Sequence, residues 1–108
     1  MLRELPVLDL RLDLVPPNVD EAAAAASLLA DPNRASIVRM LRDGPVCVCE
    51  IAAALGAREN NVSNHLARLR QAGLVRASRV GADIRRVYYE RDEAACGRAL
   101  DALREVLR

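Results

Sequence analysis

From residue 18 onward, apolar positions recur mostly every three or four residues, which is the spacing of an amphipathic helix. Local signals divide this pattern into segments. Asp31 followed by Pro32 is typical of a helix start, and Gly44 and Gly56 are typical of helix ends. We therefore predict helices over residues 19–30, 32–43, 46–55, 59–72 and 92–108.

Other regions alternate apolar and polar residues, which is the pattern of half-buried strands. Residues 74–80 and 84–90 are predicted to form the two strands of a hairpin that turns at 81–83. Residues 7–15 show the same alternation, and two interpretations stay open: an extra N-terminal strand, or a loosely ordered leader. We expect an arm over 1–17 and a single domain over 18–108, in the order α-α-α-α-β-β-α.

The third and fourth predicted helices are separated by only three residues, 56–58, as in a helix-turn-helix. With the hairpin that follows, this arrangement predicts a mainly helical winged helix-turn-helix fold. The fourth helix has a polar face that can hydrogen-bond to DNA base edges and phosphates. The residues on this face are Asn60, Asn61, Ser63, Asn64, Arg68 and Gln71. We expect His65, on the inner side of the helix, to pack or to contact a phosphate.

Positive charge is concentrated where the DNA contacts are predicted. The chain has 16 basic residues, all of them Arg, and residues 58–91 hold eight of these against three acidic residues, a local balance of +5. Arg79, Arg85 and Arg86 gather near the tip of the hairpin, where a basic wing can lie along the DNA backbone. Because the flanking segments are slightly acidic, we expect a localised DNA-binding face.

The cysteines point to thiol chemistry. No apolar run is long enough to span a bilayer and the N-terminus has no signal-sequence pattern, so we expect a cytoplasmic protein without a membrane partner. In that reducing compartment Cys47, Cys49 and Cys96 are expected to be thiols. On a regular helix Cys47 and Cys49 would point to roughly opposite sides, so packing alone does not explain the pair. The chain has no Cys-x-x-Cys motif or acid-base constellation, and we do not expect an enzyme.

Four stretches together resemble the ArsR/SmtB family of winged-helix metal-sensing repressors: "LLADPNRASIVRML", "VCVCEIAAALG", "NNVSNHLARLRQAGLV" and "RRVYY". The resemblance implies a homodimeric repressor that binds an inverted repeat in double-stranded operator DNA and leaves it when an inducer binds. It implies no cofactor other than that inducer. The dimer interface is expected on an apolar stripe of the last helix, formed by Leu100, Leu103 and Leu107.

Within this resemblance, Cys47 and Cys49 are similar to the family's arsenite and antimonite site, although Ala52 stands where the best-known pattern has a further cysteine. Trivalent arsenic is thiophilic, and its binding to the pair is expected to distort or unwind the first turn of the third helix. Cys96 is either a third ligand or redox partner reached across the dimer, or a small apolar residue on the dimer-facing stripe. Without Cys96, a methylated trivalent arsenical that needs only two sulfur atoms becomes an alternative inducer.

Other sensor sites of the family match these residues less well. A zinc site on the last helix would need a His where Ala94 stands. The family's cadmium and lead sensors that resemble this chain in the fourth predicted helix carry cysteines inside that helix. This chain has Arg68 and Ala72 there. A cadmium- or lead-sensing repressor, or a thiol-based redox or persulfide sensor, stays open as an alternative with the same fold.

Overall fold

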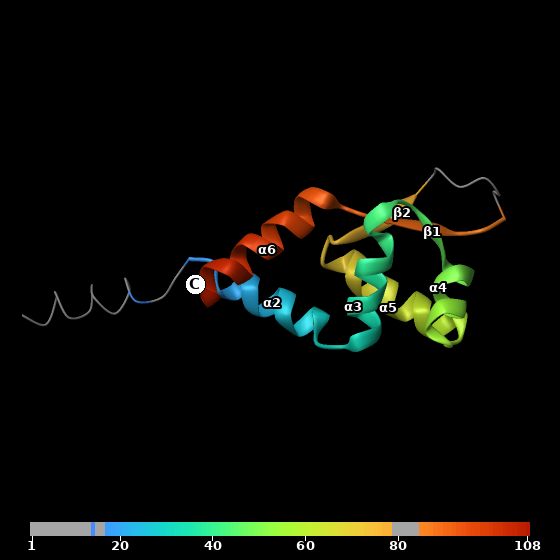
Figure 1. Ribbon diagram of the computed structural model, residues 1–108, viewed down its shortest axis with the longest axis horizontal. Helices are drawn as coiled ribbons and strands as arrows, with labels where there is room; N and C mark the ends of the chain where they lie inside the picture. The colour runs from blue at the N-terminus through green and yellow to red at the C-terminus, as the bar shows by residue number, and fades with distance from the viewer. Residues whose placement is uncertain (1–13, 15–16, 79–84) are drawn as a thin grey trace, which may run out of the picture.

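The computed structural model describes residue 14, residues 17–78 and residues 85–108. Most of the predicted arm, Arg79 and the predicted hairpin turn lie outside these residues. The described elements are α2 (Val19–Leu29), α3 (Pro32–Met40), the 3-10 turn η1 (Leu41–Asp43), β1 (Val46–Cys47), α4 (Val48–Leu55), α5 (Glu59–Gln71), β2 (Val75–Ser78), β3 (Tyr88–Arg91) and α6 (Glu93–Leu107). Figure 1 shows α2 and α6 side by side, with α3, α4, α5 and the sheet further along the molecule. The predicted winged helix-turn-helix fold is confirmed.

The sheet has three strands in the order β1-β3-β2, with β3 antiparallel to both neighbours. The register places Cys47 of β1 opposite Tyr88 of β3. The prediction of a helix over 46–55 was therefore wrong at its start, because residues 46 and 47 form a strand and α4 begins at Val48. A strand of two residues has no repeating pattern of its own, so apolar spacing along the chain could not predict it.

The core lies between the helices and the sheet and is built from aliphatic side chains and Ala. Val62, Leu66 and Leu69 of α5 are fully buried, as their helical spacing predicts. They belong to one cluster with buried side chains of α3, α4 and β2. This packing fixes α5 against α4, so the polar face of α5 is turned outward. No described helix is long and apolar enough to cross a membrane.

The predicted start of the second helix is confirmed at Asp31. The Asp31 Oδ1 atom accepts hydrogen bonds from the backbone N–H groups of Asn33 at 2.8 Å and Arg34 at 3.3 Å. Desolvation acts to raise the pKa of Asp31, but these two N–H donors together with the electrostatic effects of His65 and Arg34 outweigh it, and the pKa lies below its ordinary value. Pro32 follows at the first helical position, where the missing N–H leaves no donor unsatisfied.

The angle between α4 and α5 depends on a tight turn at Gly56. This residue has φ 63° and ψ 34°, in the left-handed region that favours glycine. The next N–H, from Ala57, donates to the Ala52 carbonyl at 3.0 Å and closes the end of α4. The chain can therefore reverse within three residues and begin α5 at Glu59.

We predict that Gly56→Ala lowers the free energy of unfolding by about 1 kcal/mol, because a residue with a Cβ atom is strained in the left-handed region. A Cβ atom at this position would meet no atom within 4 Å. The loss of stability would therefore come from the backbone conformation and not from a steric clash. Urea denaturation followed by circular dichroism measures the change.

Gly97 is the matched control, since it lies inside α6 and a Cβ atom there also meets nothing within 4 Å. Gly97→Ala should raise the free energy of unfolding by about 0.5–1 kcal/mol, because Ala has the higher helix propensity. If both substitutions changed stability in the same direction and by the same amount, the left-handed turn would not need Gly56.

Candidate functional site

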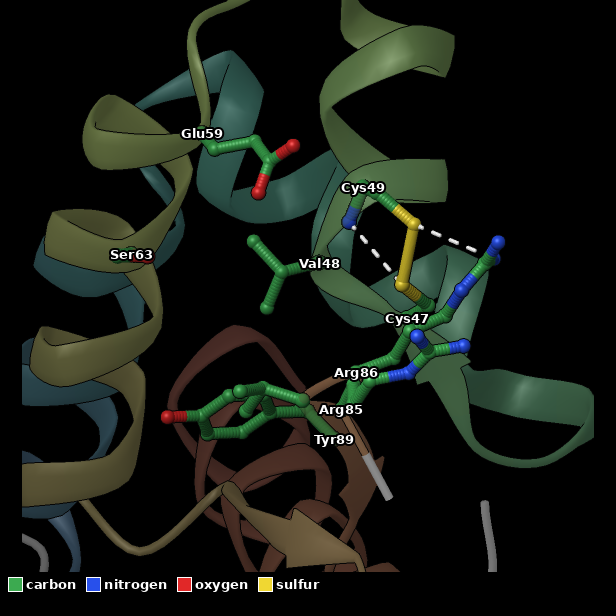
Figure 2. Close-up of a pocket in the computed structure, with 9 residues that line it drawn as sticks. Cys47, Val48, Cys49, Glu59, Ser63, Arg85, Arg86 and Tyr89 are labelled. Atoms are coloured by element: carbon green, nitrogen blue, oxygen red, sulfur yellow. Dashed lines mark hydrogen bonds between the residues drawn. A yellow bond between two sulfur atoms is a disulfide. The ribbon is translucent and has the colours of Figure 1, made fainter. Parts of the chain in front are cut away.

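Cys47 and Cys49 meet at the point where β1 passes into α4. The structure joins their sulfur atoms in a disulfide, with the two Cα atoms 5.3 Å apart (Figure 2). We expected two separate thiols from the sequence, and the structure instead pairs them. When the disulfide is reduced, the same backbone leaves two thiols next to each other.

The two side chains converge because Cys47 is not part of the helix. Its backbone is extended, with φ −74° and ψ 144°, and it serves as the N-cap residue of α4. The expectation that binding distorts or unwinds the first helical turn was based on a helix that begins at residue 46. Cys47 lies on β1 and Cys49 lies in the first turn of α4, so the two side chains converge while the helix is intact.

Hydrogen bonds fix the position of both sulfur atoms. The Cys49 N–H donates to the Cys47 Sγ at 3.3 Å, and the Cys47 N–H donates to the Glu50 Oε1 at 3.1 Å, which together form a capping box. The Arg86 Nη1 donates to the Cys49 Sγ at 3.7 Å. The N–H group of Cys49 and the guanidinium of Arg86 thus both donate to the sulfur atoms. The site is therefore suited to a ligand that binds through sulfur.

A pocket of about 530 Å³ opens beside the two cysteines. It lies between the start of α4, the helix α5, which is the second helix of the helix-turn-helix and is called the recognition helix below, and β3, a strand of the wing (Figure 2). We call it the cysteine pocket, and its lining residues are Cys47, Val48, Cys49, Glu59, Ser63, Arg85, Arg86, Val87 and Tyr89. A ligand in this pocket would lie against each of the elements that a winged helix-turn-helix presents to DNA.

The cysteine pocket contains residues that sequence reasoning placed elsewhere or missed. Ser63, predicted to read DNA, lines the pocket and is also solvent-exposed. Glu59 was not predicted as a site residue, although it precedes Ser63 by one helical turn and therefore shares its side of α5. Tyr89 reaches the pocket through the pairing of β3 with β1, and Val87, just before β3, is held there by the hydrogen bond from the Val48 N–H to its carbonyl. No local sequence pattern reveals either contact.

The polar face of α5 has the exposure that DNA contact requires. We call it the recognition face, and all of its residues are solvent-exposed: Asn60, Asn61, Ser63, Asn64, Arg68 and Gln71. His65 is half-buried, and its packing or phosphate-contacting role stays a prediction. Arg85 and Arg86 are also exposed, next to the start of β3.

Cys96 lies away from the cysteine pair and faces the core of its own chain. It is half-buried, and its thiol donates to the Leu74 carbonyl at 3.8 Å. Burial raises the pKa of the Cys96 thiol, the charge of Arg91 partly opposes this, and Glu93 and Asp92 add to it. Among the residues that the structure describes, no three His, Cys, Asp or Glu side chains come together as a metal site. Within one chain, Cys96 packs against the core, and its role as a third ligand across a dimer stays a prediction.

The apolar stripe predicted on the last helix divides between two surfaces. Cys96 packs against the core, whereas Leu100 is 52% exposed and Leu107 is 80% exposed. Leu103 lies between them and is half-buried. Val106, next to this set, is 45% exposed. The outer part of α6 thus presents a continuous apolar surface, which is rare on a protein that stays monomeric.

Comparison with known proteins agrees with this architecture. The model of the family described as bacterial regulatory protein, arsR family, matches residues 31–77. A solution structure of the homodimeric winged helix-turn-helix domain of Mb0332 from Mycobacterium bovis, described as a possible ArsR-family regulator, is 32% identical. It superposes with a TM-score of 0.61 over 77% of this chain and 76% of that one. This chain belongs to the arsR family.

Other proteins similar to this chain are described as transcriptional regulators. The regulator CmtR of Mycobacterium tuberculosis is 43% identical over 79 residues, which are 73% of this chain and 64% of CmtR. The chain therefore spans slightly less than two thirds of the length of that relative. A crystal structure of a possible transcriptional regulator for arsenical resistance superposes with a TM-score of 0.69. It is 27% identical and covers 78% of this chain and 84% of that one.

We predict that the Cys96 thiol of this arsR-family protein is alkylated more slowly in the folded chain than in the unfolded chain at every pH from 7 to 9. Only the thiolate reacts, and a raised pKa keeps the folded thiol protonated to higher pH. The Cys47→Ser/Cys49→Ser double variant leaves Cys96 as the single thiol, and mass spectrometry after iodoacetamide treatment gives the rates. The same variant in urea is the control, and equal rates in both states would contradict the burial of Cys96.

Proposed function

We propose that this chain is a transcriptional repressor that binds operator DNA as a homodimer and leaves it when trivalent arsenic or antimony binds Cys47 and Cys49. The observation that carries the proposal is the convergence of the two sulfur atoms at the N-terminus of α4, next to the recognition helix and the wing. Membership of a family of bacterial regulatory proteins supports the regulatory part. The resemblance to a possible regulator for arsenical resistance supports the inducer.

In this proposal the recognition face of α5 enters the major groove. The amide side chains of Asn60, Asn61 and Asn64 lie in its first two turns, where recognition helices meet base edges. Arg85 and Arg86 approach the phosphate backbone from the wing, and the electrostatic attraction they add falls as salt rises. Two recognition helices related by a two-fold axis would read an inverted repeat.

The homodimer would form through the outer surface of α6. Leu100, Leu103 and Leu107 line one continuous apolar region of this helix. A two-fold axis brings the same patch of each subunit together, so one apolar stripe is enough to make both sides of the interface. The Mb0332 domain, which has the same fold, is homodimeric.

Inducer binding would replace oxygen ligands of arsenic with the two thiolates. Arsenite, As(OH)₃, exchanges two hydroxyl groups for Cys47 and Cys49 and releases two water molecules, while the third hydroxyl stays on arsenic. Soft ions of this kind prefer thiolate ligands, and antimony would bind in the same way. Cadmium or lead is the alternative for a site with sulfur ligands, and each would need further ligands from solvent.

Binding at the pair would be transmitted through the contacts that already hold it. The Cys47 backbone pairs with β3, and the Val48 N–H donates to the Val87 carbonyl at 3.0 Å. A ligand that bonds both sulfur atoms would set the spacing between Cys47 on β1 and Cys49 in α4. A change in this spacing would move α4 relative to the wing. Coupling of about 1–3 kcal/mol between ligand and DNA is enough for regulation, and it corresponds to a roughly 5- to 150-fold change in affinity.

A thiol-based redox sensor is the second candidate, and the disulfide between Cys47 and Cys49 favours it. Peroxide would convert the two thiols to the disulfide and would itself be reduced to two water molecules. Under this candidate peroxide releases the DNA and arsenite does not. Under the main proposal arsenite releases DNA from the reduced protein, and peroxide prevents that response by consuming the thiols.

We predict that Cys47→Ser and Cys49→Ser each keep DNA binding but lose release by arsenite, because each leaves only one sulfur atom at the site. Serine is a good N-cap residue, so Cys47→Ser should preserve the start of α4. Fluorescence anisotropy of reduced protein on DNA from its own upstream region, titrated with arsenite, measures both properties.

Cys96→Ser is the control for these substitutions and should respond to arsenite like the unchanged chain. Arsenite should weaken DNA binding by roughly 5- to 150-fold in the unchanged chain and in Cys96→Ser. Release that persists in both Cys47→Ser and Cys49→Ser would exclude the pair as the inducer site.

We predict different effects for the recognition face and the wing. Asn64→Ala should change the sequence preference, with a loss of about 1–3 kcal/mol on the operator and little on unrelated DNA. Arg85→Ala should weaken binding to every sequence and reduce the slope of log affinity against log salt by about 1. Binding assays on operator and scrambled DNA at several salt concentrations separate the two, and identical losses on all sequences would contradict this docking.

A further inference from the structure

We infer that Ala67 is a specificity-determining residue of the recognition helix, and that it reads the 5-methyl group of a thymine in each half of the operator. Asn64 and Gln71, about one helical turn before and after it, read adenine on either side of that thymine. This inference rests on the proposed function and specifies the base pairs that the recognition helix selects. It follows from the geometry of α5, the exposure of its side chains and the chemistry of base edges.

The side of α5 opposite the core carries four exposed residues. Val62, Leu66 and Leu69 are fully buried and mark the direction of the core. Because successive residues turn by about 100°, residues spaced by four, three and four positions from Asn60 lie on the opposite side of the helix. We call this set the central stripe, and its residues are Asn60, Asn64, Ala67 and Gln71. Side chains opposite the core reach deepest into a groove that the helix enters.

Arginine lies on both edges of the central stripe and not within it. Arg68 and Arg70 are both exposed, and each is turned by roughly 70–90° from the middle of the stripe, in opposite directions. A helix in the major groove turns its two edges toward the two phosphate backbones, so both guanidinium groups are placed for phosphate contacts. The central stripe itself has no arginine for the bidentate contact to guanine, which is the commonest specific pairing.

The side chains of the central stripe match A·T base pairs. The amide of Asn or Gln donates to adenine N7 and accepts from the adenine N6 amino group, so one side chain makes two hydrogen bonds. The methyl group of Ala67 makes no hydrogen bond, and the apolar feature that the major groove offers it is the thymine 5-methyl group. Contact between the two methyl groups removes apolar surface from water, which favours binding.

The position of Ala67 distinguishes this role from helix propensity. Alanine stabilises a helix at any exposed position. Ala67 is nevertheless the single alanine among the thirteen residues of α5, and it lies on the central stripe between Asn64 and Gln71. Its short side chain lets the helix backbone come close to the bases, so the two neighbouring amides can reach base edges on both sides. The polar pattern of the sequence did not include this residue, because alanine is not polar.

Replacement of thymine by uracil tests the contact, because it removes only the 5-methyl group. Footprinting of the reduced full-length chain on DNA from its own upstream region first locates the operator. Each thymine of the protected sequence is then replaced by deoxyuridine, one position at a time and in both half-sites together, and fluorescence anisotropy gives the affinity. We expect a thymine position at which loss of the methyl group weakens binding by roughly three- to fivefold for each half-site.

Substitutions assign this loss to Ala67. Ala67→Gly removes the methyl group of the protein, so this variant should bind thymine and uracil equally at that position. The two bases are compared within one variant, so any loss of helix stability caused by glycine cancels. Ala94→Gly is the matched control, because Ala94 is an exposed alanine of another helix, α6, and this variant should keep the full preference for thymine.

The two amides are tested with 7-deazaadenine, which lacks the N7 acceptor of adenine. We expect this base to weaken binding at one adenine on each side of the thymine read by Ala67. Asn64→Ala should abolish the effect at one of these adenines, and Gln71→Ala should abolish it at the other. Affinity that 7-deazaadenine leaves unchanged at both would overturn the assignment of the amides.

The outcomes separate this inference from the proposed function. If no thymine position lost affinity on replacement by uracil, or if Ala67→Gly kept the preference for thymine at every position, the inference would be overturned. Specific binding to the operator and its release by arsenite would still support the proposed repressor in that case. If the reduced chain did not bind DNA from its upstream region at all, the proposed function would fail together with the inference.

Discussion

The convergence of the cysteine pair depends on the extended backbone of Cys47, which pairs with β3 and caps α4 at the same time. Because the backbone at this residue is extended, the Cys47 side chain turns toward the first turn of the helix and meets Cys49. On a regular helix the two side chains would diverge. The pairing of a two-residue strand with the wing therefore creates the thiol site.

The same pairing connects the cysteine pair to the recognition face and the wing, which we propose to contact DNA. β1 is short, so few backbone hydrogen bonds hold the start of α4 to the wing, and a modest change in free energy can alter this junction. The buried stripe of α5, formed by Val62, Leu66 and Leu69, keeps the rest of the helix-turn-helix rigid. A rigid core with one weakly held junction is a suitable arrangement for a ligand-controlled switch.

Much of the fold could be predicted from local sequence. The helix start at Asp31, the turn at Gly56 and the buried stripe of α5 all follow from spacing and capping signals. The strand β1 could not be predicted, because its hydrogen-bond partner lies some 40 residues later in the chain. That long-range contact also determines the convergence of the cysteine pair. The prediction of a helix at residues 46–47 therefore placed the two side chains on opposite sides.

Cys96 shows a second limit of sequence reasoning. Helical spacing places Cys96 on the same side of α6 as Leu100 and Leu107. In the structure, Cys96 packs against the core of the chain, whereas Leu100 and Leu107 lie on the exposed apolar surface of α6. Only the packing of α6 decides which residue joins which surface. X-ray absorption spectroscopy at the arsenic edge, on the reduced protein loaded with arsenite, tests the resulting two-sulfur site most directly. We predict two sulfur neighbours and one oxygen around each arsenic atom, whereas three sulfur neighbours would contradict a site built from Cys47 and Cys49 alone.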